Sequence, residues 1–152
     1  MNAAASGQGV SASGHPARRA DVFFYGLFMD EDLLRTKGLN PTGAELASLP
    51  GFELRIGERA AVAPAPSGRV HGVVMSLALD DVERLYADPG VRSYEPQAVL
   101  VELDRGGLIA ALCYNLPVPS PATARNLDYA TKLRATAAKV GLPAAYVESI
   151  GS

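Results

Sequence analysis

The stretch DVFFYGLFMDEDLL, residues 21–34, constrains the fold more than any other part of this sequence. Its β-branched and aromatic residues predict a strand that ends at Tyr25-Gly26. Asp30 follows closely and predicts a helix start, because its carboxylate can accept hydrogen bonds from backbone N–H groups there. Glycine allows a tight turn and lets a ligand approach the backbone. Such a junction directs several N–H donors to one place, as anion and oxyanion sites do, although most strand-to-helix turns bind nothing.

Length and composition predict one domain with an ordinary hydrophobic core. The chain has 152 residues, of which 48% are hydrophobic and 20% charged, and its net charge is −2. Single domains commonly have about 100–150 residues. Because there is no excess of basic residues to neutralise phosphates, we expect no nucleic-acid partner. A single cysteine, Cys113, excludes an internal disulfide and is compatible with a reducing compartment, so we expect a cytoplasmic protein.

The first part of the chain differs in composition from the rest. Residues 1–20 are rich in Ala, Ser and Gly and contain neither an acidic residue nor the apolar segment of a signal peptide. We therefore predict a disordered tail over 1–20 and one domain over 21–152. The longest apolar runs, such as VFFYGLFM and LIAALCY, are shorter than the ~20 residues that a membrane-spanning helix needs. No membrane partner is expected.

Turn residues and periodicity divide the domain into elements. A helix from Asp30 to Lys37 is expected to end at Gly38, which readily adopts the left-handed conformation after a helix. Alternation of apolar and charged residues over 52–56 predicts a half-buried strand. The segment APAPSG, 63–68, predicts a loop, because prolines and glycine do not suit a sheet interior. RVHGVVMSLAL, 69–79, predicts a strand that is covered on both faces.

The second half of the domain is expected to contain three helices and two strands. Asp80 and Glu83 have the spacing of a capping box and predict a short helix that ends at Asp88-Pro89-Gly90. The remaining chain is expected to form a strand over 97–104, a strand GLIAALCY that makes a hairpin with it, a helix over 126–140, and a short helix from Pro143. Three or four helices without regular βαβ alternation predict an α+β fold with a strongly curved or closed sheet.

Most residue types that carry chemistry lack partners in this sequence. His71 stands alone in an apolar strand, so neither a catalytic triad nor a metal site is expected. Cys113 lies in an apolar strand and is interpreted as a small buried hydrophobic residue. No phosphate-binding loop occurs, so nucleotide and redox cofactors are not expected. Asp88 differs, because a carboxylate at a helix C-terminus tends towards a raised pKa and basicity. Alternatively, Asp88 only shapes its turn.

Several motifs together resemble the gamma-glutamylcyclotransferase-like (AIG2-like) family. They are YGLFMDEDLL, VHGVVMSL followed by LDDVERLYADPG, then Tyr94 with the strand VLVEL, and CY in a late strand. Family members carry YGS/TLM after the first strand, a Gly-x-hydrophobic-hydrophobic strand, a helix that ends in an acid, and a Tyr before a core strand. The resemblance covers nearly everything after the tail, in the same order. It implies a small mixed β-barrel flanked by helices, with one cavity.

The family's reaction is intramolecular aminolysis of a γ-glutamyl amide. The α-amine of the substrate attacks its own γ-carbonyl and releases 5-oxoproline and an amine, which needs no cofactor because both reacting groups belong to one molecule. The resemblance thus implies a small γ-glutamyl amide or amine as substrate. Asp88 falls on the family's glutamate and is the implied proton shuttle, with Glu95 as the fallback. The implied substrate-binding residues are Tyr25, Gly26, Leu27, Phe28, Tyr94 and Tyr114.

Two departures from the family pattern bear on activity. Asp88 is one methylene shorter than the family's glutamate and is followed by Pro rather than Gly. Leu27 stands where the family has Ser or Thr, so the backbone donors remain while a hydroxyl is lost. Two other functions therefore stay open. One is a non-catalytic member of the fold that binds a small amide or amino acid; the other is an interaction module whose helix at 126–140 docks a partner.

Overall fold

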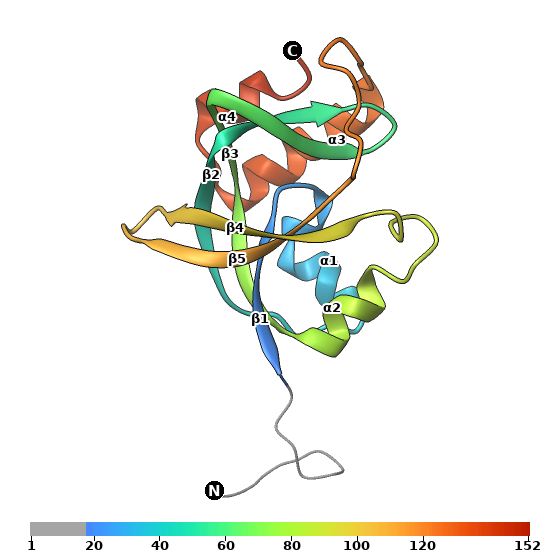
Figure 1. Ribbon diagram of the computed structural model, residues 1–152, viewed down its shortest axis with the longest axis vertical. Coiled ribbons are helices and arrows are strands. Elements are labelled where there is room, and N and C mark those ends of the chain that lie inside the picture. Colours follow the sequence, from blue (N-terminus) through green and yellow to red (C-terminus); the bar gives the residue numbers. More distant parts are fainter. Residues whose placement is uncertain (1–17) are drawn as a thin grey trace, which may run out of the picture.

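A computed structural model describes residues 18–152 of the chain (Figure 1). In chain order its elements are β1 (Arg19–Phe24), the 3-10 helix η1 (Leu27–Met29), α1 (Glu31–Thr36), β2 (Thr42–Ile56), β3 (Ala60–Ala78), α2 (Leu79–Leu85), β4 (Glu95–Leu103), β5 (Leu108–Asn115), α3 (Leu127–Val140) and α4 (Ala144–Ser149). None of the helices in this part of the chain is long and apolar enough to cross a membrane.

Within residues 18–152 the five strands close into a barrel in the order β1-β3-β2-β4-β5. β1 closes it by running parallel to β5, with Val22 opposite Leu112, whereas the other neighbouring strands are antiparallel. A closed barrel has no free sheet edge around its circumference, so its strands need no further covering strand. The expected α+β fold with a mixed, closed barrel is confirmed.

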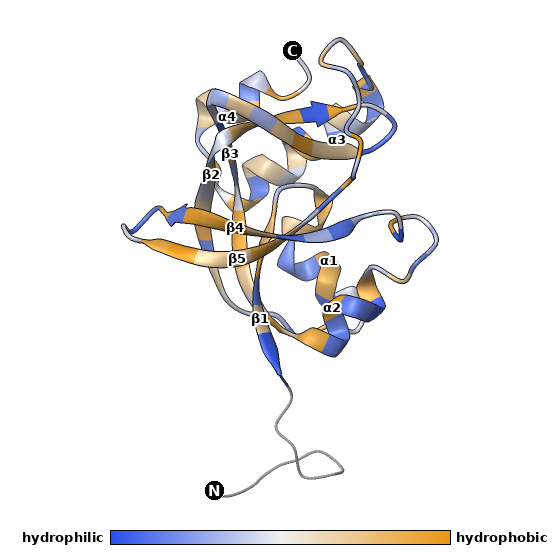
Figure 2. Ribbon diagram, viewed as in Figure 1, coloured by the Kyte–Doolittle hydropathy of each residue, from blue (hydrophilic) through white to orange (hydrophobic). Residues whose placement is uncertain are grey.

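The second half of β3 lies at the centre of the packing. Val70, Met75 and Leu77 each have 0% exposure, and they belong to two groups of buried side chains on opposite faces of the strand. This part of the strand is hydrophobic at nearly every position because both of its faces are covered. Figure 2 shows hydrophobic colour along much of the β4–β5 hairpin as well, whereas the start of β1 is hydrophilic.

The first half of β3 corrects one expectation. The segment 63–68, expected to be a loop, continues the strand, and its prolines Pro64 and Pro66 are exposed. β1 pairs with β3 only from Val73 onward, so residues 63–68 have no partner on that side. A register shift also lies between Pro50, which pairs with Arg69, and Phe52, which pairs with Pro64. Proline is tolerated because this stretch is irregular and has no neighbouring strand on the β1 side.

The helix starts give one confirmation and one correction. Asp30 caps α1 as expected, with a carboxylate oxygen 3.0 Å from the Asp32 backbone nitrogen. The predicted capping box at Asp80 is wrong, because α2 begins earlier, at Leu79, and its N-cap residue is Ala78, which offers no side-chain oxygen. Asp80 instead lies in the first turn, where its negative charge interacts favourably with the helix dipole.

α3 is the longest helix of the described chain. Its buried residues Ala130, Leu133 and Ala137 lie on one face, as the spacing in the sequence predicts. Asn126 caps the helix by accepting a hydrogen bond from the Tyr129 backbone nitrogen at 3.1 Å, and Gly141 ends it with φ +92°. Since its apolar face is already buried in the domain, the helix holds Tyr129 in a fixed position.

The predicted tail lies mostly outside the described residues, although β1 begins at Arg19, within the predicted 1–20 range.

Candidate functional site

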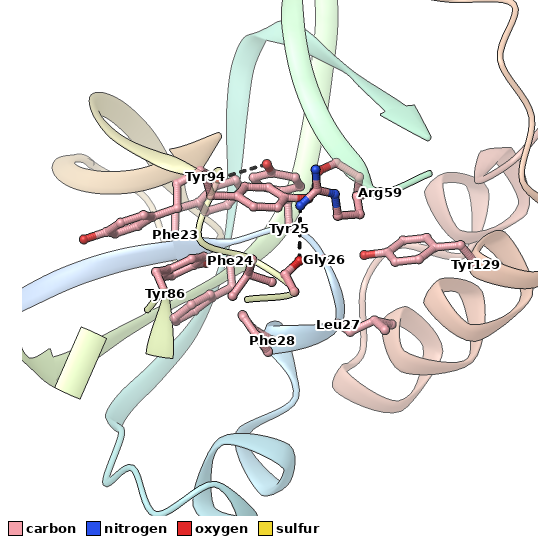
Figure 3. A pocket seen from close by; sticks show the side chains of 14 residues that line it. Phe23, Phe24, Tyr25, Gly26, Leu27, Phe28, Arg59, Tyr86, Tyr94 and Tyr129 are labelled. Atoms are coloured by element: carbon pink, nitrogen blue, oxygen red, sulfur yellow. Dashed lines mark hydrogen bonds between the residues drawn. The ribbon is translucent and has the colours of Figure 1, made fainter. Parts of the chain in front are cut away.

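A cavity of about 170 Å³ lies beside the turn that follows β1 (Figure 3). It is lined by Phe23, Phe24, Tyr25, Gly26, Leu27, Phe28, Arg59, Ala60, Tyr86, Gly90, Val91, Tyr94, Tyr114 and Tyr129. We call this the aromatic pocket, because Phe and Tyr supply most of its wall. The lining, as the structure describes it, contains one charged side chain, that of Arg59, and neither Asp nor Glu.

The turn at Gly26 presents backbone donors to the aromatic pocket. β1 runs into the core and stops, after which η1 begins with the Met29 nitrogen 3.0 Å from the Gly26 carbonyl oxygen. Within residues 18–152 the N–H groups of Gly26 and Phe28 make no backbone hydrogen bond, whereas the Leu27 N–H is directed at the Tyr129 hydroxyl. An ideal Cβ placed on Gly26 would lie 3.1 Å from the Tyr129 hydroxyl oxygen, so glycine allows this close approach. The turn therefore has the donor arrangement expected for binding a carboxylate or an oxyanion.

Stacked and edge-on aromatic rings fix one wall of the pocket. The Tyr86 and Tyr114 rings are parallel within 5°, with centroids 4.0 Å apart. The Phe28 ring meets the Tyr86 ring edge-on, with centroids 5.8 Å apart. The centroid of the Tyr94 ring lies 6.1 Å from that of Tyr86. Aromatic side chains have few rotatable bonds and bury a large area, so this wall is rigid and apolar. It suits the hydrocarbon or aromatic part of a small ligand.

Tyr25 ties the turn after β1 to the neighbouring strand β5. Its hydroxyl donates to the Tyr114 carbonyl oxygen at 2.9 Å, and it also lies 3.4 Å from the Asn115 Oδ1 atom. Pro96, the register partner of Tyr114, has no N–H to offer that carbonyl. Tyr25 therefore satisfies a buried acceptor across the sheet, in addition to lining the pocket.

The phenol groups of the pocket are poor bases. Burial raises the pKa of Tyr25, and nearby groups including Cys113 and Tyr94 raise it further. Burial likewise raises the pKa of Tyr94, with a smaller lowering from Arg59. For Tyr129, burial raises the pKa and the backbone N–H of Leu27 opposes this. These hydroxyls thus stay protonated near neutral pH and can orient a ligand, but they cannot take its proton.

Arg59 is a pocket residue that the sequence did not reveal. Its Nη1 atom donates to the Gly90 carbonyl oxygen at 3.1 Å and to the Ser93 Oγ atom at 2.8 Å. Its guanidinium carbon lies 5.6 Å from the centre of the Tyr94 ring, a cation–π distance. Figure 3 shows its side chain reaching over the pocket between Tyr94 and Gly26. Arg59 therefore holds the segment around Gly90 against the pocket and places a positive charge at its edge.

The two predicted carboxylates lie outside the described lining. Asp88 is exposed, and its Oδ1 atom accepts a hydrogen bond from the Gly90 backbone nitrogen at 2.8 Å. This local bond is typical of Asp two residues before a turn N–H and directs the carboxylate along the chain. Glu95, the fallback, is exposed at the start of β4. The catalytic roles given to Asp88 and Glu95 remain predictions.

All six predicted substrate-binding residues, by contrast, come together in the pocket. They are Tyr25, Gly26, Leu27, Phe28, Tyr94 and Tyr114. Tyr86 and Tyr129 join Arg59 as lining residues that were not predicted. Tyr86 lies two residues before Asp88 and could have been suggested by that spacing, whereas no local pattern marks Arg59 or Tyr129.

Cys113 and His71 do not line the aromatic pocket. Cys113 has 0% exposure, and burial raises the pKa of its thiol to about 12, as expected for a structural cysteine. His71 packs against Tyr146, with ring centroids 4.8 Å apart. In the part of the chain that the structure describes, no group of three or more His, Cys, Asp or Glu residues is placed to hold a metal ion.

Comparison with known proteins decides the family. Residues 22–132 match the profile of the family described as gamma-glutamyl cyclotransferase, AIG2-like. The chain belongs to this family. No curated protein sequence matches it significantly.

Solved structures share the fold of this cyclotransferase-family chain at low sequence identity. A structure described as a gamma-glutamyl cyclotransferase has TM-score 0.71 and 21% identity over 88% of this chain and 86% of its own. An uncharacterized protein from Homo sapiens gives TM-score 0.68 and 24% identity over 87% and 86%. A protein of Arabidopsis thaliana gives TM-score 0.62 and 24% identity over 83% and 88%. These likenesses show the fold; the pocket residues must support the function.

Proposed function

We propose that this family member binds a small γ-glutamyl amide, or a related amino-acid amide, in the aromatic pocket without cyclising it. The observation that carries the proposal is that the described lining offers backbone donors, Arg59 and aromatic rings, but no carboxylate. The pocket thus has the parts for recognition and lacks a resident group for proton transfer.

One part of the ligand would bind the polar edge of the aromatic pocket, and another part would pack against its aromatic wall. The N–H groups of Gly26 and Phe28 have no backbone partner in the described chain, and Arg59 brings its guanidinium to the same pocket. Charge-assisted hydrogen bonds from these donors suit the α-carboxylate of a γ-glutamyl group. The amine-derived part of the ligand would then pack against the Tyr86–Tyr114 stack.

Cyclisation makes a demand that this lining does not meet. The attacking amine must lose a proton, and the leaving nitrogen must gain one, so a group with a pKa matched to both steps is needed. The tyrosines are unsuitable because burial raises their pKa values. The guanidinium group of Arg59 offers only N–H donors and no acceptor, so it cannot act as the base.

Turnover through Asp88 is the second candidate, and the position of its neighbours favours it. Gly90 and Val91 line the pocket, so Asp88 is only two residues from the lining. To serve as the shuttle, its carboxylate would release the Gly90 N–H and turn towards the ligand. That rotation would place the family's acid–base chemistry on a side chain one methylene shorter than glutamate.

The two candidates differ in their product. The protein would be incubated with a panel of γ-glutamyl amines and γ-glutamyl amino acids, with binding measured by calorimetry and 5-oxoproline by mass spectrometry. We expect at least one compound to bind without 5-oxoproline forming. R59Q should weaken that binding about tenfold, the effect of one charge-assisted hydrogen bond.

Matched variants complete the test. R84Q removes an exposed arginine that pairs with Asp81 on α2, and it should leave ligand affinity unchanged. D88N should bind within about twofold of the wild type, because the Asp88 carboxylate lies outside the described lining. If the wild type releases 5-oxoproline and D88N does not, binding without turnover is wrong and Asp88 is the shuttle. If no compound of the panel binds, both candidates fail.

A further inference from the structure

A second cavity, of about 200 Å³, lies between the end of β2, the loop before α3, and the last residues of the chain. It is lined by Leu54, Arg55, Ile56, Arg69, Ala122, Ala124, Arg125, Asn126, Tyr146, Ser149, Ile150, Gly151 and Ser152. We call it the arginine cavity. Figure 1 shows this loop and the end of the chain at the same end of the molecule as the β2–β3 hairpin. The arginine cavity and the aromatic pocket have no lining residue in common.

The lining is cationic. It contains Arg55, Arg69 and Arg125, and no Asp or Glu occurs among its described residues. Two of these arginines are each paired at one side with an acid outside the lining. Arg55 Nε lies 2.7 Å from Glu53, and Arg69 Nη1 lies 2.8 Å from Glu102. Their other guanidinium N–H groups, on Arg55 Nη2 and on Arg69 Nε and Nη2, have no partner in the described chain and can still donate.

Arg125 has no acidic partner within residues 18–152. Its Nη1 atom donates to two carbonyl oxygens of its own loop, those of Ala122 at 3.0 Å and Ala124 at 2.8 Å. This local bonding holds one edge of the guanidinium and leaves Nε and Nη2 available. Arg125 thus contributes a positive charge that forms no ion pair with an Asp or Glu side chain of the described chain.

The loop that carries Arg125 is fixed to the barrel. Asn126 Nδ2 donates to the Gly57 carbonyl oxygen at 2.9 Å, and Arg55 Nη1 donates to the Ser120 carbonyl oxygen at 3.0 Å. The arginines are therefore positioned before any ligand arrives, which reduces the entropy lost on binding. Tyr146 also lines the cavity.

We propose that the arginine cavity binds a small phosphorylated compound. The planar guanidinium group presents N–H donors in a fork that matches phosphate oxygens. A terminal phosphate has three such oxygens and a charge near −2, so it can engage several guanidinium groups at once. A carboxylate has two oxygens and one charge, and it would leave more of the donors unused. The site is additional to the aromatic pocket and does not depend on the function proposed for it.

The probe is inorganic pyrophosphate, titrated by calorimetry into the full chain at constant ionic strength, with inorganic phosphate and succinate in parallel. We expect saturable binding of pyrophosphate, weaker binding of phosphate, and little binding of succinate. R125Q should weaken pyrophosphate binding at least tenfold. R125K, which keeps the charge but loses the fork, should give an intermediate affinity.

The matched control is R105Q, at the exposed tip of the β4–β5 hairpin, where Arg105 pairs with Glu45. R105Q should bind pyrophosphate as the wild type does. A ligand-free unfolding curve for each variant shows whether it is folded, and R69Q provides a second cavity variant should R125Q be unstable. Absence of saturable pyrophosphate binding, equal losses in R125Q and R105Q, or preference for succinate would each overturn the proposal.

Discussion

Replacement of Gly72 by alanine should destabilise the folded protein. A Cβ built on this residue lies 2.2 Å from the Phe24 carbonyl oxygen and 3.0 Å from the Phe23 ring. The first distance is far shorter than any ordinary carbon–oxygen contact, and the atom it meets belongs to the backbone of β1. Since that atom cannot rotate away, β1 and β3 must separate at the point where Phe24 pairs with Val73.

The cost of G72A follows from this contact. Adding a carbon to a packed core typically costs about 1–3 kcal/mol, and a clash with backbone belongs at the upper end. Replacing glycine restricts the unfolded chain and returns at most about 1 kcal/mol. We therefore expect the free energy of unfolding to fall by about 2 kcal/mol. For a domain of this size, that corresponds to a Tm decrease of about 4–8 °C.

Urea unfolding followed by circular dichroism measures this change, and G90A is the matched control. A Cβ on Gly90 would meet the Asp88 Oδ1 atom at 3.2 Å, and this exposed side chain can move aside. G90A should therefore stay within about 0.5 kcal/mol of the wild type. Equal stability of G72A and G90A would contradict this prediction, because β1 and β3 could then adjust without cost.

Two further predictions concern Tyr25 and His71. Y25F removes the donor to the Tyr114 carbonyl oxygen and should lower the free energy of unfolding by about 1–2 kcal/mol, measured in urea; an unchanged midpoint would contradict this. Burial lowers the pKa of His71 from its ordinary value of 6.5, so the unfolded chain binds the proton more readily. Stability should therefore decrease as the pH falls below about 6.5, and H71Q should lose less stability between pH 7.5 and 5.5 than the wild type.

The sequence predicted the parts of the fold whose signals are local. Asp30 caps its helix, Gly38 and Gly141 follow helix ends with positive φ, and Gly106-Gly107 turn the β4–β5 hairpin. Each of these features depends on the conformational preference of one or two residues. The extended strand through Pro64 was missed because its tolerance of proline comes from an absent neighbour on one side, which no local pattern reports.

Local sequence signals predicted one part of the candidate site, and only the folded structure revealed the other part. The turn donors from Gly26 to Phe28 could be predicted, because they come from one continuous junction of strand and helix. Arg59 and Tyr129 could not, since they come from a distant hairpin and a late helix, and only closure of the barrel brings them beside Gly26. Burial of the tyrosine hydroxyls, which raises their pKa values, likewise depends on the packing of all these segments together.

The amino-acid sequence by itself predicted an α+β fold with a strongly curved or closed sheet and the turn after the first strand, because strand alternation, capping and glycine turns are short-range properties of the chain. Tertiary structure decided which charged groups line the aromatic pocket. Asp88 precedes a sharp turn in either case, but its carboxylate bonds to the Gly90 N–H while Arg59, 29 positions earlier in the numbering, reaches the pocket. The direction of a side chain depends on the neighbours that surround it in space, and those neighbours come from the whole chain.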